Sequence, residues 1–590
     1  AFLLALSGCN AQDYKITFKV NMMSEQRPKT VGLKGNIAPL DWNKEYPMTD
    51  IDGDGIYETT ITFNTAKRNL RYTYTADGHE ELQGADKRIT WFKAQPQTVV
   101  QIFNEYSSYD DGKIEKLNYS GYQIQEDVKV LREAITYIHP NLYKYRDSLL
   151  LERDFEELEA EMLANPTLTN AYKTLSRFTT KIKCSHTFTN PWNQGPDIKR
   201  AIFFQADKLP FSFKRIGKQI FVDKNATENG QLQYGHEILS IDSVPAQEVM
   251  TRLATYITSD GNNYEKRLQR LTLSGSSKFE LFDIFYPLEF GRKDSFRLKL
   301  KNHLTGDTLI TTVKAISKTR RNALFMKKYT DYGSSFENGW DFKLLKNKTA
   351  YLKMESFAVF STDFDWKSFI NNAFETIRSE KIENLVIDIR GNEGGDTVVA
   401  EYIMERIISD PITIEIPANT TRYRKIPEAL KSYISTWDKK PYDWGKKLKY
   451  IGNGRYKLKN AYAATGQTFK PEKNNFDGSV YLLVNAENSS ATHIMATYAK
   501  KYKLATLVGQ ETGGNQKGLN GGYMFFLRLP NSRIEVDIPV FGIQILKETD
   551  ETYDGGVRPD ILVKKNIPDL VNGVDTEMQK VFEMIEKKNK

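Results

Sequence analysis

The sequence predicts a multidomain α+β fold, on three grounds. The chain has 590 residues, which at about 100 to 200 residues per domain implies roughly three to five domains. Hydrophobic residues make up 40% of it and charged residues 27%, a composition typical of a folded chain with several cores. The apolar spacing changes from strand alternation to helical periods, back to strands, and finally to strands and helices in turn.

Residues 13–107 are predicted to form a β-sandwich. Ile16, Phe18 and Val20 alternate with polar neighbours, and the same alternation returns from Tyr57 to Phe63. Alternation of this kind is typical of strands with one buried face.

Within this segment, the stretch from Val31 to Tyr57 resembles the immunoglobulin-type starch-binding and glycogen-binding modules. The resemblance implies an immunoglobulin-like sandwich that could bind glycan through Trp42 or Trp91, although filling the sandwich core is the more common role for such a ring. The turn at 50–55 begins like a calcium loop, but its twelfth position is Ile instead of Glu. A hairpin turn is therefore favoured, with calcium as the alternative.

Residues 118–190 are predicted to be helical. Apolar residues at helical spacing mark three helices, within 128–138, 155–162 and 172–178. The helices lead up to the pair Ser185-His186.

Residues 205–318 are predicted to return to strands, interrupted by an insertion at about 250–290. A glycine turn at Tyr234-Gly235 followed by the strand from Ile238 to Ile241 resembles a PDZ domain. Such a domain binds a peptide as an extra strand at the edge of its sheet.

Residues 345–575 alternate strands and helices. The continuous apolar runs at 385–389 and 480–484 are typical of strands covered on both faces. This part of the chain is therefore predicted to be an α/β layer fold.

Ser490 is the candidate nucleophile. It follows the strand at 480–484 and precedes a helix, and a serine at a strand-to-helix turn exposes its hydroxyl beside the amides of the helix N-terminus. Taken alone, the position favours an N-cap over a nucleophile, because Ser is a preferred capping residue. Ser489 is the alternative if the register differs by one residue.

The glycine-rich turn Asp388-Ile-Arg390-Gly-Asn392-Glu-Gly394-Gly395 directly follows the other buried strand. Backbone N–H groups of such a turn can hold a developing oxyanion. Phosphate binding is disfavoured because neither a P-loop nor the GxGxxG spacing is present.

Together these motifs resemble the C-terminal processing peptidase family, the tail-specific and tricorn-type serine proteases. The resemblance covers about 120–570 and implies a crotonase-like layered peptidase core that cleaves proteins or peptides, selecting them by the C-terminus, without cofactor or metal. It rests on the following ordered signals: Ser185-His186, the glycine-rich turn, Ser490-Ala491, Val508-Gly509-x-x-Thr512-Gly513-Gly514 and Gly556-Val557-x-Pro559-Asp560.

The resemblance offers two bases. In the tricorn-like plan the base is a histidine preceded by a serine, which Ser185-His186 matches, and a neutral imidazole suits proton removal from Ser490. In the other plan a lysine follows the serine, and Lys517 is the alternative base, two residues out of register. His493, three residues after Ser490 on one helix, is expected to pack beside it instead.

The remaining roles are also implied by the resemblance. Asp554 is the nearest acid to the Gly-Val-x-Pro-Asp signature and is assigned to orient the base. The oxyanion hole is assigned to backbone N–H groups of Gly394, Gly395 and Ala491. Cys184, beside Ser185, is expected to be a small buried apolar residue.

The first nine residues resemble a truncated lipoprotein signal, with Leu6-Ser7-Gly8-Cys9 as its lipobox. The resemblance implies lipid on Cys9 and a protein exported to the bacterial cell envelope, at the outer membrane or cell surface. Lys and Arg number 83 against 75 Asp and Glu, spread along the chain, so nucleic acid is not an expected partner. The six scattered histidines predict no metal site.

The sequence therefore predicts a lipid-anchored serine endopeptidase with Ser490 as nucleophile and His186 as base. Two alternatives stay open: a catalytically inactive glycan-binding or peptide-binding lipoprotein, and a Ser-Lys peptidase that uses Lys517.

Overall fold

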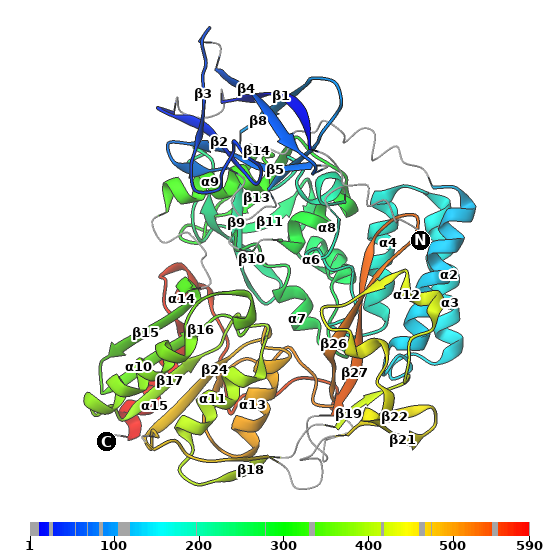
Figure 1. Ribbon diagram of the computed structural model, residues 1–590. Coiled ribbons are helices and arrows are strands. Elements are labelled where there is room, and N and C mark those ends of the chain that lie inside the picture. Colours follow the sequence, from blue (N-terminus) through cyan, green and yellow to red (C-terminus); the bar gives the residue numbers. More distant parts are fainter. Residues whose placement is uncertain are drawn as a thin grey trace.

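The computed structural model of the chain is shown in Figure 1. It describes residues 11–22, 28–53, 55–67, 69–81, 87–103, 119–195, 198–275, 277, 279–329, 337–414, 418–459, 467–473, 475–544 and 553–588. Cys9 and the predicted lipobox lie outside the described residues, as does Asp54 of the turn at 50–55.

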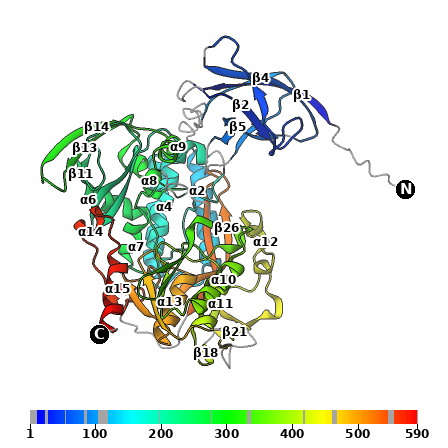
Figure 2. The same cartoon turned by 90° about the vertical axis from the view of Figure 1, so that its left-hand side faces the viewer.

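Two small sheets at the N-terminal end enclose a core of their own (Figure 2), in which Ile16, Phe18 and Val20 are buried. Trp91 is 61% exposed. The core-filling role that the sequence favoured for this ring is therefore wrong. The sheets are ordered β4-β1-β8 and β3-β2-β5-β6, with β7 paired to β5. Their strands are β1 (Gln12–Asn21), β2 (Val31–Gly35), β3 (Tyr46–Met48), β4 (Ile56–Thr65), β5 (Asn69–Ala76), β6 (His79–Glu80), β7 (Arg88–Trp91) and β8 (Gln97–Ile102).

Three helices follow: α2 (Gly121–Ile138), α3 (Ser148–Ala164) and α4 (Leu168–Lys181). At the start of each helix the side chain of the N-cap residue, Ser120, Asp147 or Thr167, accepts a hydrogen bond from a backbone N–H of the first turn. This satisfies an amide that the helix itself leaves free. The predicted apolar stripes face one core. The end of α4 sets the position of Ser185 and His186.

A sheet ordered β14-β13-β11-β10-β9, with β12 paired to β11, comes next. The segment between β12 and β13 is largely helical, and Figure 1 shows its helix α7 between this sheet and the next layer. The elements are η1 (Lys199–Phe203), β9 (Phe211–Ile216), β10 (Gln219–Asn225), β11 (Glu237–Ile241), β12 (Val244–Pro245), α6 (Ala246–Leu253), η2 (Ala254–Tyr256), α7 (Tyr264–Gln269), α8 (Leu281–Phe290), β13 (Ser295–Lys301), β14 (Thr308–Lys314) and α9 (Lys318–Lys328).

The α/β layer is a sheet ordered β15-β16-β17-β24-β25-β28. Its pairs from β16 to β28 are parallel, and every residue of β17 is buried, as expected for a strand covered on both faces. The carboxyl ends of β17 and β24 therefore meet at one edge, where ligand sites of such sheets form. The elements are η3 (Glu337–Gly339), β15 (Trp340–Leu345), β16 (Thr349–Met354), η4 (Val359–Ser361), α10 (Trp366–Ser379), β17 (Asn384–Asp388), α11 (Thr397–Ile407), β24 (Ser479–Val484), α13 (Ala491–Lys501), β25 (Thr506–Gly509), β28 (Ile561–Leu562), α14 (Ile567–Val571) and α15 (Thr576–Lys588).

A last sheet, ordered β20-β26-β27-β19-β22-β21, combines the segment before β24 with two long strands after β25. Its side chains on β26 and β27 join the core of the three helices. The elements are β18 (Ile412–Ile414), β19 (Ala418–Thr421), α12 (Glu428–Lys431), β20 (Ile434–Ser435), η5 (Lys440–Tyr442), η6 (Gly445–Lys447), β21 (Leu448–Gly452), β22 (Arg455–Leu458), β23 (Gln467–Phe469), β26 (Leu519–Arg528) and β27 (Glu535–Gln544), with β18 and β23 forming a separate pair.

Among the described residues, no helix is both long enough and apolar enough to cross a bilayer.

Candidate active site

Ser490 stands at the turn between β24 and α13. It is the N-cap residue of α13 with a φ of 52°, but its side chain makes no cap hydrogen bond, so capping does not occupy its hydroxyl. A positive φ costs a non-glycine residue about 1–2 kcal/mol, and such strain often occurs at functional turns. Its hydroxyl bonds to no residue that the structure describes, whereas Ser489 is buried and its Oγ donates to the carbonyl of Glu393 over 3.1 Å.

The glycine-rich turn lies directly against Ser490. A Cβ added to Gly394, whose φ is +110°, would lie 2.9 Å from Ser490 Cβ and 3.0 Å from the backbone N of Ala491. Only glycine therefore fits this contact. The turn and the start of α13 form a single wall.

The N–H groups on this wall differ in availability. Gly394 donates its N–H to the side chain of Asn392 over 2.8 Å, so the prediction that Gly394 belongs to an oxyanion hole is wrong. The N–H groups of Gly395 and Ala491 have no acceptor among the described residues. These two donors are free to bind a developing negative charge.

Hydrogen bonds lock the turn to the serine loop. The carbonyl of Asn392 accepts from Asn488 Nδ2 at 3.1 Å and from Thr492 Oγ1 at 2.8 Å, and Asn392 Nδ2 donates to the carbonyl of Met354 at 2.9 Å. All three polar side chains are buried, where hydrogen bonds hold geometry most strongly.

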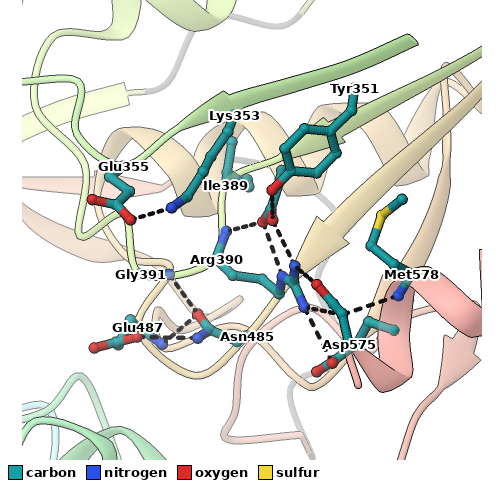
Figure 3. A network of polar contacts seen from close by, with 12 residues as sticks. Tyr351, Lys353, Glu355, Ile389, Arg390, Gly391, Asn485, Glu487, Asp575 and Met578 are labelled. Carbon is teal, nitrogen blue, oxygen red and sulfur yellow. Dashed lines mark hydrogen bonds and ion pairs between the residues drawn. The ribbon is translucent and has the colours of Figure 1, made fainter. Parts of the chain in front are cut away.

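Figure 3 shows a second network behind the turn. Arg390 donates to Asp388 over 2.6 Å and to Asp575 over 2.7 Å, and Tyr351 also donates to Asp388, over 2.7 Å. The N–H of Gly391 donates to Asn485 Oδ1 over 3.2 Å. Since Asp575 directly precedes α15, the network fastens the glycine-rich turn to that helix.

His186 is held through Ser185 by an acid that the sequence did not indicate. Ser185 Oγ donates to Asp260 Oδ2 over 2.5 Å and lies 3.3 Å from His186 Nδ1, and the N–H of Ser185 donates to Asp260 Oδ1 over 3.0 Å. The predicted orienting acid, Asp554, is not the carboxylate beside Ser185.

Asp554 instead supports the loop that carries Asp260. It accepts hydrogen bonds from Tyr145 at 3.0 Å, from Asn515 at 2.7 Å and from Asn262 at 2.6 Å. With three neutral donors, this carboxylate fixes the position of Asn262 and so of the neighbouring Asp260.

The contacts of Ser185 determine the tautomer of His186. Because the single proton of Ser185 Oγ goes to Asp260, its oxygen can only accept from the imidazole, and the proton of His186 is therefore on Nδ1. Nε2 keeps its lone pair and lies 3.9 Å from where a Cβ on Gly521 would be. Burial lowers the pKa of His186, and Asp260 partly opposes this, so the ring is neutral at pH 7.

Helix α7 brings cations that the sequence did not single out. Lys266 is 2% exposed, its Cδ lies 2.9 Å from the position of a Cβ on Gly513, and burial lowers its pKa. Arg270, which follows α7, pairs with Glu393 at 3.0 Å. Both cations lower the pKa of His186, and Glu393 raises it.

The other candidate bases and nucleophiles are either buried or located away from Ser490 and His186. His493 is fully buried, shares a 2.8 Å hydrogen bond with Thr512 Oγ1, and burial lowers its pKa to about 4. Burial raises the pKa of the Cys184 thiol to about 12, so it is no thiolate at neutral pH. Lys517 lines a separate cavity whose lining includes neither Ser490 nor His186.

A cleft of about 590 Å³ opens beside the glycine-rich turn. Its lining includes the rings of Phe188, Trp192 and Phe279 together with Arg270 and Glu393, and the Arg270 guanidinium lies 5.7 Å from the centre of the Phe188 ring. An aromatic wall with a few polar groups is typical of a site that binds a side chain of a ligand.

Within the described ranges, no cluster of three or more His, Cys, Asp or Glu side chains could hold a metal ion.

Residues 348–563 match the family model described as Peptidase family S41, and no curated protein matches the chain. Among solved structures, mature CPAF complexed with lactacystin is similar, with a TM-score of 0.53 and 14% identity over 79% of this chain and 98% of that one. This likeness concerns the fold alone.

Two further protease structures are similar more distantly. The photosystem II D1 C-terminal processing protease has a TM-score of 0.35 and 13% identity, over 77% of this chain and 98% of that one. The tricorn protease has a TM-score of 0.31 and 13% identity, over 90% of this chain and 42% of that one.

Proposed function

Since the chain is a serine peptidase of family S41, with residues 348–563 as the matching segment, we propose that Ser490 is its nucleophile and His186 its general base. The observation that carries the proposal is the hydroxyl of Ser490, which is unbonded among the described residues and lies at a strained turn beside the free N–H groups of Gly395 and Ala491.

The chemistry follows from these groups. Ser490 Oγ attacks the substrate carbonyl carbon while its proton passes to His186 Nε2. The oxyanion that forms on the carbonyl oxygen accepts hydrogen bonds from the N–H groups of Gly395 and Ala491. When the C–N bond breaks, His186 returns the proton to the leaving amine. Water then hydrolyses the acyl-enzyme by the same route.

Ser185 and Asp260 are positioning residues in this scheme. They keep the proton of His186 on Nδ1, and the charge of Asp260 stabilises the imidazolium that forms during attack. No hydrogen bond joins Ser490 to His186 in the structure, and the hydrogen bond of such a catalytic pair often tightens only in the complex with substrate.

We further propose that the substrate is a polypeptide whose side chain occupies the aromatic cleft beside Glu393. The exposed Trp192 ring, 56% accessible, supports this role, because a rigid aromatic surface beside a nucleophile is suited to anchoring a ligand. The PDZ-like sheet from β9 to β14 is proposed to select the C-terminus of the substrate as an added strand.

The sequence Leu6-Ser7-Gly8-Cys9 supports a lipid anchor on Cys9 and a place at the bacterial cell envelope, at the outer membrane or cell surface. The exposed Trp91 supports a glycan-docking role for the N-terminal sandwich. Labelling of cells with a fatty-acid analogue tests the anchor: incorporation that persists in Cys9→Ser would contradict it.

The central test is covalent labelling with a fluorophosphonate probe, followed by mass spectrometry. An adduct on Ser490 is expected in the unaltered chain, and none in Ser490→Ala. Ser489→Ala is the matched control and should still be labelled. Labelling of the folded Ser490→Ala chain at the rate of the unaltered chain would contradict the assignment.

A further inference from the structure

A second cavity has a volume of about 1130 Å³. It is bounded by the loop after α2, the β21–β22 hairpin and the end of β27; in that sheet β19 lies between β27 and β22 (Figure 1). Pockets for small molecules measure about 300–1,000 Å³. This cavity therefore has room for a stretch of several residues of polypeptide.

Positive charge dominates the lining. Its cationic side chains are Lys144, Arg422, Arg455, Lys457 and Lys517. The single carboxylate is that of Asp554, which already accepts from Tyr145, Asn515 and Asn262. None of the five cations forms an ion pair with any residue that the structure describes. Lys144 and Lys517 interact electrostatically with Asp554, so the positive charge beyond that one carboxylate is available for a ligand.

Two of the cations have buried donors that lack acceptors. Arg422 Nη1 and Arg455 Nε are buried without a hydrogen-bond partner in the described parts of the chain. A buried donor left unsatisfied costs about 1–3 kcal/mol, more when it is charged. An anion that entered the cavity would remove this cost.

Both guanidinium groups are held in place before any ligand binds. Arg455 Nη2 donates to Asn141 Oδ1 at 2.9 Å and to Thr420 Oγ1 at 3.0 Å, and Arg422 lies over the ring of Tyr143 at 4.9 Å. A fixed guanidinium fork matches the two oxygens of a carboxylate.

Hydrogen-bonded residues connect the lining of the cavity to the neighbourhood of the proposed base, His186. Asn141 donates to Asn520 Oδ1 over 2.8 Å, and Asn520 Nδ2 contacts the sulfur of Cys184 at 3.3 Å. The next residue, Gly521, is the one whose Cβ position lies 3.9 Å from His186 Nε2. A polypeptide bound in the cavity would therefore lie close to the catalytic histidine.

We infer that this basic cavity is a recognition site for an acidic segment of the polypeptide substrate, read by Arg422, Arg455 and the lysines around them. The inference rests on the proposed peptidase function and adds a substrate class to it: chains that carry clustered Asp or Glu residues near the bond that is cleaved. The arginine forks bind the carboxylates, and the lysines supply long-range attraction.

The test compares two fluorescent peptides that differ only in four consecutive residues, Glu in one and Gln in the other. Binding to the Ser490→Ala chain is measured by anisotropy, so that neither peptide is cleaved. The Glu peptide is expected to bind at least about tenfold more tightly at low salt, with the difference shrinking as salt rises. Equal binding of the two peptides would overturn the inference.

Variants locate the site. Arg455→Gln and Lys457→Gln should each reduce the preference for the Glu peptide, and together abolish it. Lys449→Gln is the matched control, because Lys449 is exposed on β21 outside the lining. If the Arg455→Gln chain does not fold because the bonds to Asn141 and Thr420 are lost, the effect of Lys457→Gln alone tests the location of the site. A preference that survives the lining variants, or that Lys449→Gln removes, contradicts the site.

Two further outcomes separate the possibilities. Pyrophosphate that displaces the Glu peptide at a lower concentration than unlabelled Glu peptide would indicate a small-anion site and overturn the inference. Because the binding assay needs no turnover, a Glu preference in Ser490→Ala together with an unaltered chain that cleaves no peptide would disprove the proposed function and leave the acidic-segment site standing.

Discussion

The serine side and the histidine side of the candidate site are built in different ways. Ser490 and its glycine-rich turn come from the ends of two adjacent parallel strands, β17 and β24, and buried hydrogen bonds join them directly. His186 comes from the end of the helical segment, and its acid, Asp260, from a loop 75 residues further on than Ser185. One half belongs to a single layer, and the other is assembled from two separate segments.

The difference shows what each half depends on. The geometry of the serine side is fixed by one sheet and survives as long as that layer folds. The histidine side depends on the docking of the loop at 259–263, which Asn263 fastens by donating to the carbonyl of Thr512 over 2.9 Å. Changes that loosen this docking should reduce proton transfer without changing the oxyanion wall.

The largest effects should come from the two reacting groups. Ser490→Ala and His186→Ala are each expected to lower kcat/KM by about 10⁴-fold or more, and the double variant no further, because the pair acts as a unit. Steady-state cleavage of an unstructured peptide measures this. Additive losses would indicate that the serine and histidine sides act independently.

A methyl group added at Gly394 should displace Ser490. In Gly394→Ala the new Cβ would lie 2.7 Å from the carbonyl of Ser489, and the serine must move, so a loss of about a hundredfold in kcat is expected. Gly217→Ala is the matched control, since Gly217 also has a positive φ but open space around it. Equal losses in the two variants would assign the effect to backbone strain alone.

The histidine side is tested by a pair of acids. Asp260→Asn should lower kcat/KM by about tenfold to a hundredfold, because Asp260 acts on His186 only through Ser185, whereas an acid in direct contact is worth roughly 10⁴. Asp554→Asn should cost less. A larger loss in Asp554→Asn would restore the assignment made from the sequence.

The smallest effect is a shift of the pH profile. Activity requires neutral His186, and burial lowers the pKa of this ring, so the acid limb of kcat/KM should lie below the ordinary histidine value of about 6.5. Asp260 raises that pKa, so Asp260→Asn should move the limb to still lower pH. A limb that moves to higher pH would show that Asp260 does not act on the base.

Much of the serine side could be predicted because its signals are local. The apolar runs of β17 and β24 precede their turns directly, and parallel strands bring these turns to one edge. The finer assignment of Gly394 failed because the side chain of Asn392 takes its N–H, a contact that no spacing reveals.

The acid of the histidine side could not be predicted for a different reason. Asp260 lies in a segment that the sequence marks only as an insertion, and the partner of Ser185 depends on how that loop docks. The same holds for Lys266 on α7 and for Arg270 directly after it. Their neighbours become apparent only when the three layers are packed together.

The ion-pair partners of Arg390 lie on both sides of Ser490 in the sequence. In addition to Asp388 and Asp575, its guanidinium bonds to the buried Glu577 over 3.1 Å, and both acids at 575 and 577 come after every proposed catalytic residue in the chain. A chain emerging from the ribosome therefore carries Ser490, His186 and the oxyanion wall before it can clamp the turn. A chain that ends before residue 575 would thus contain the proposed catalytic residues but lack two of the three carboxylates that hold Arg390.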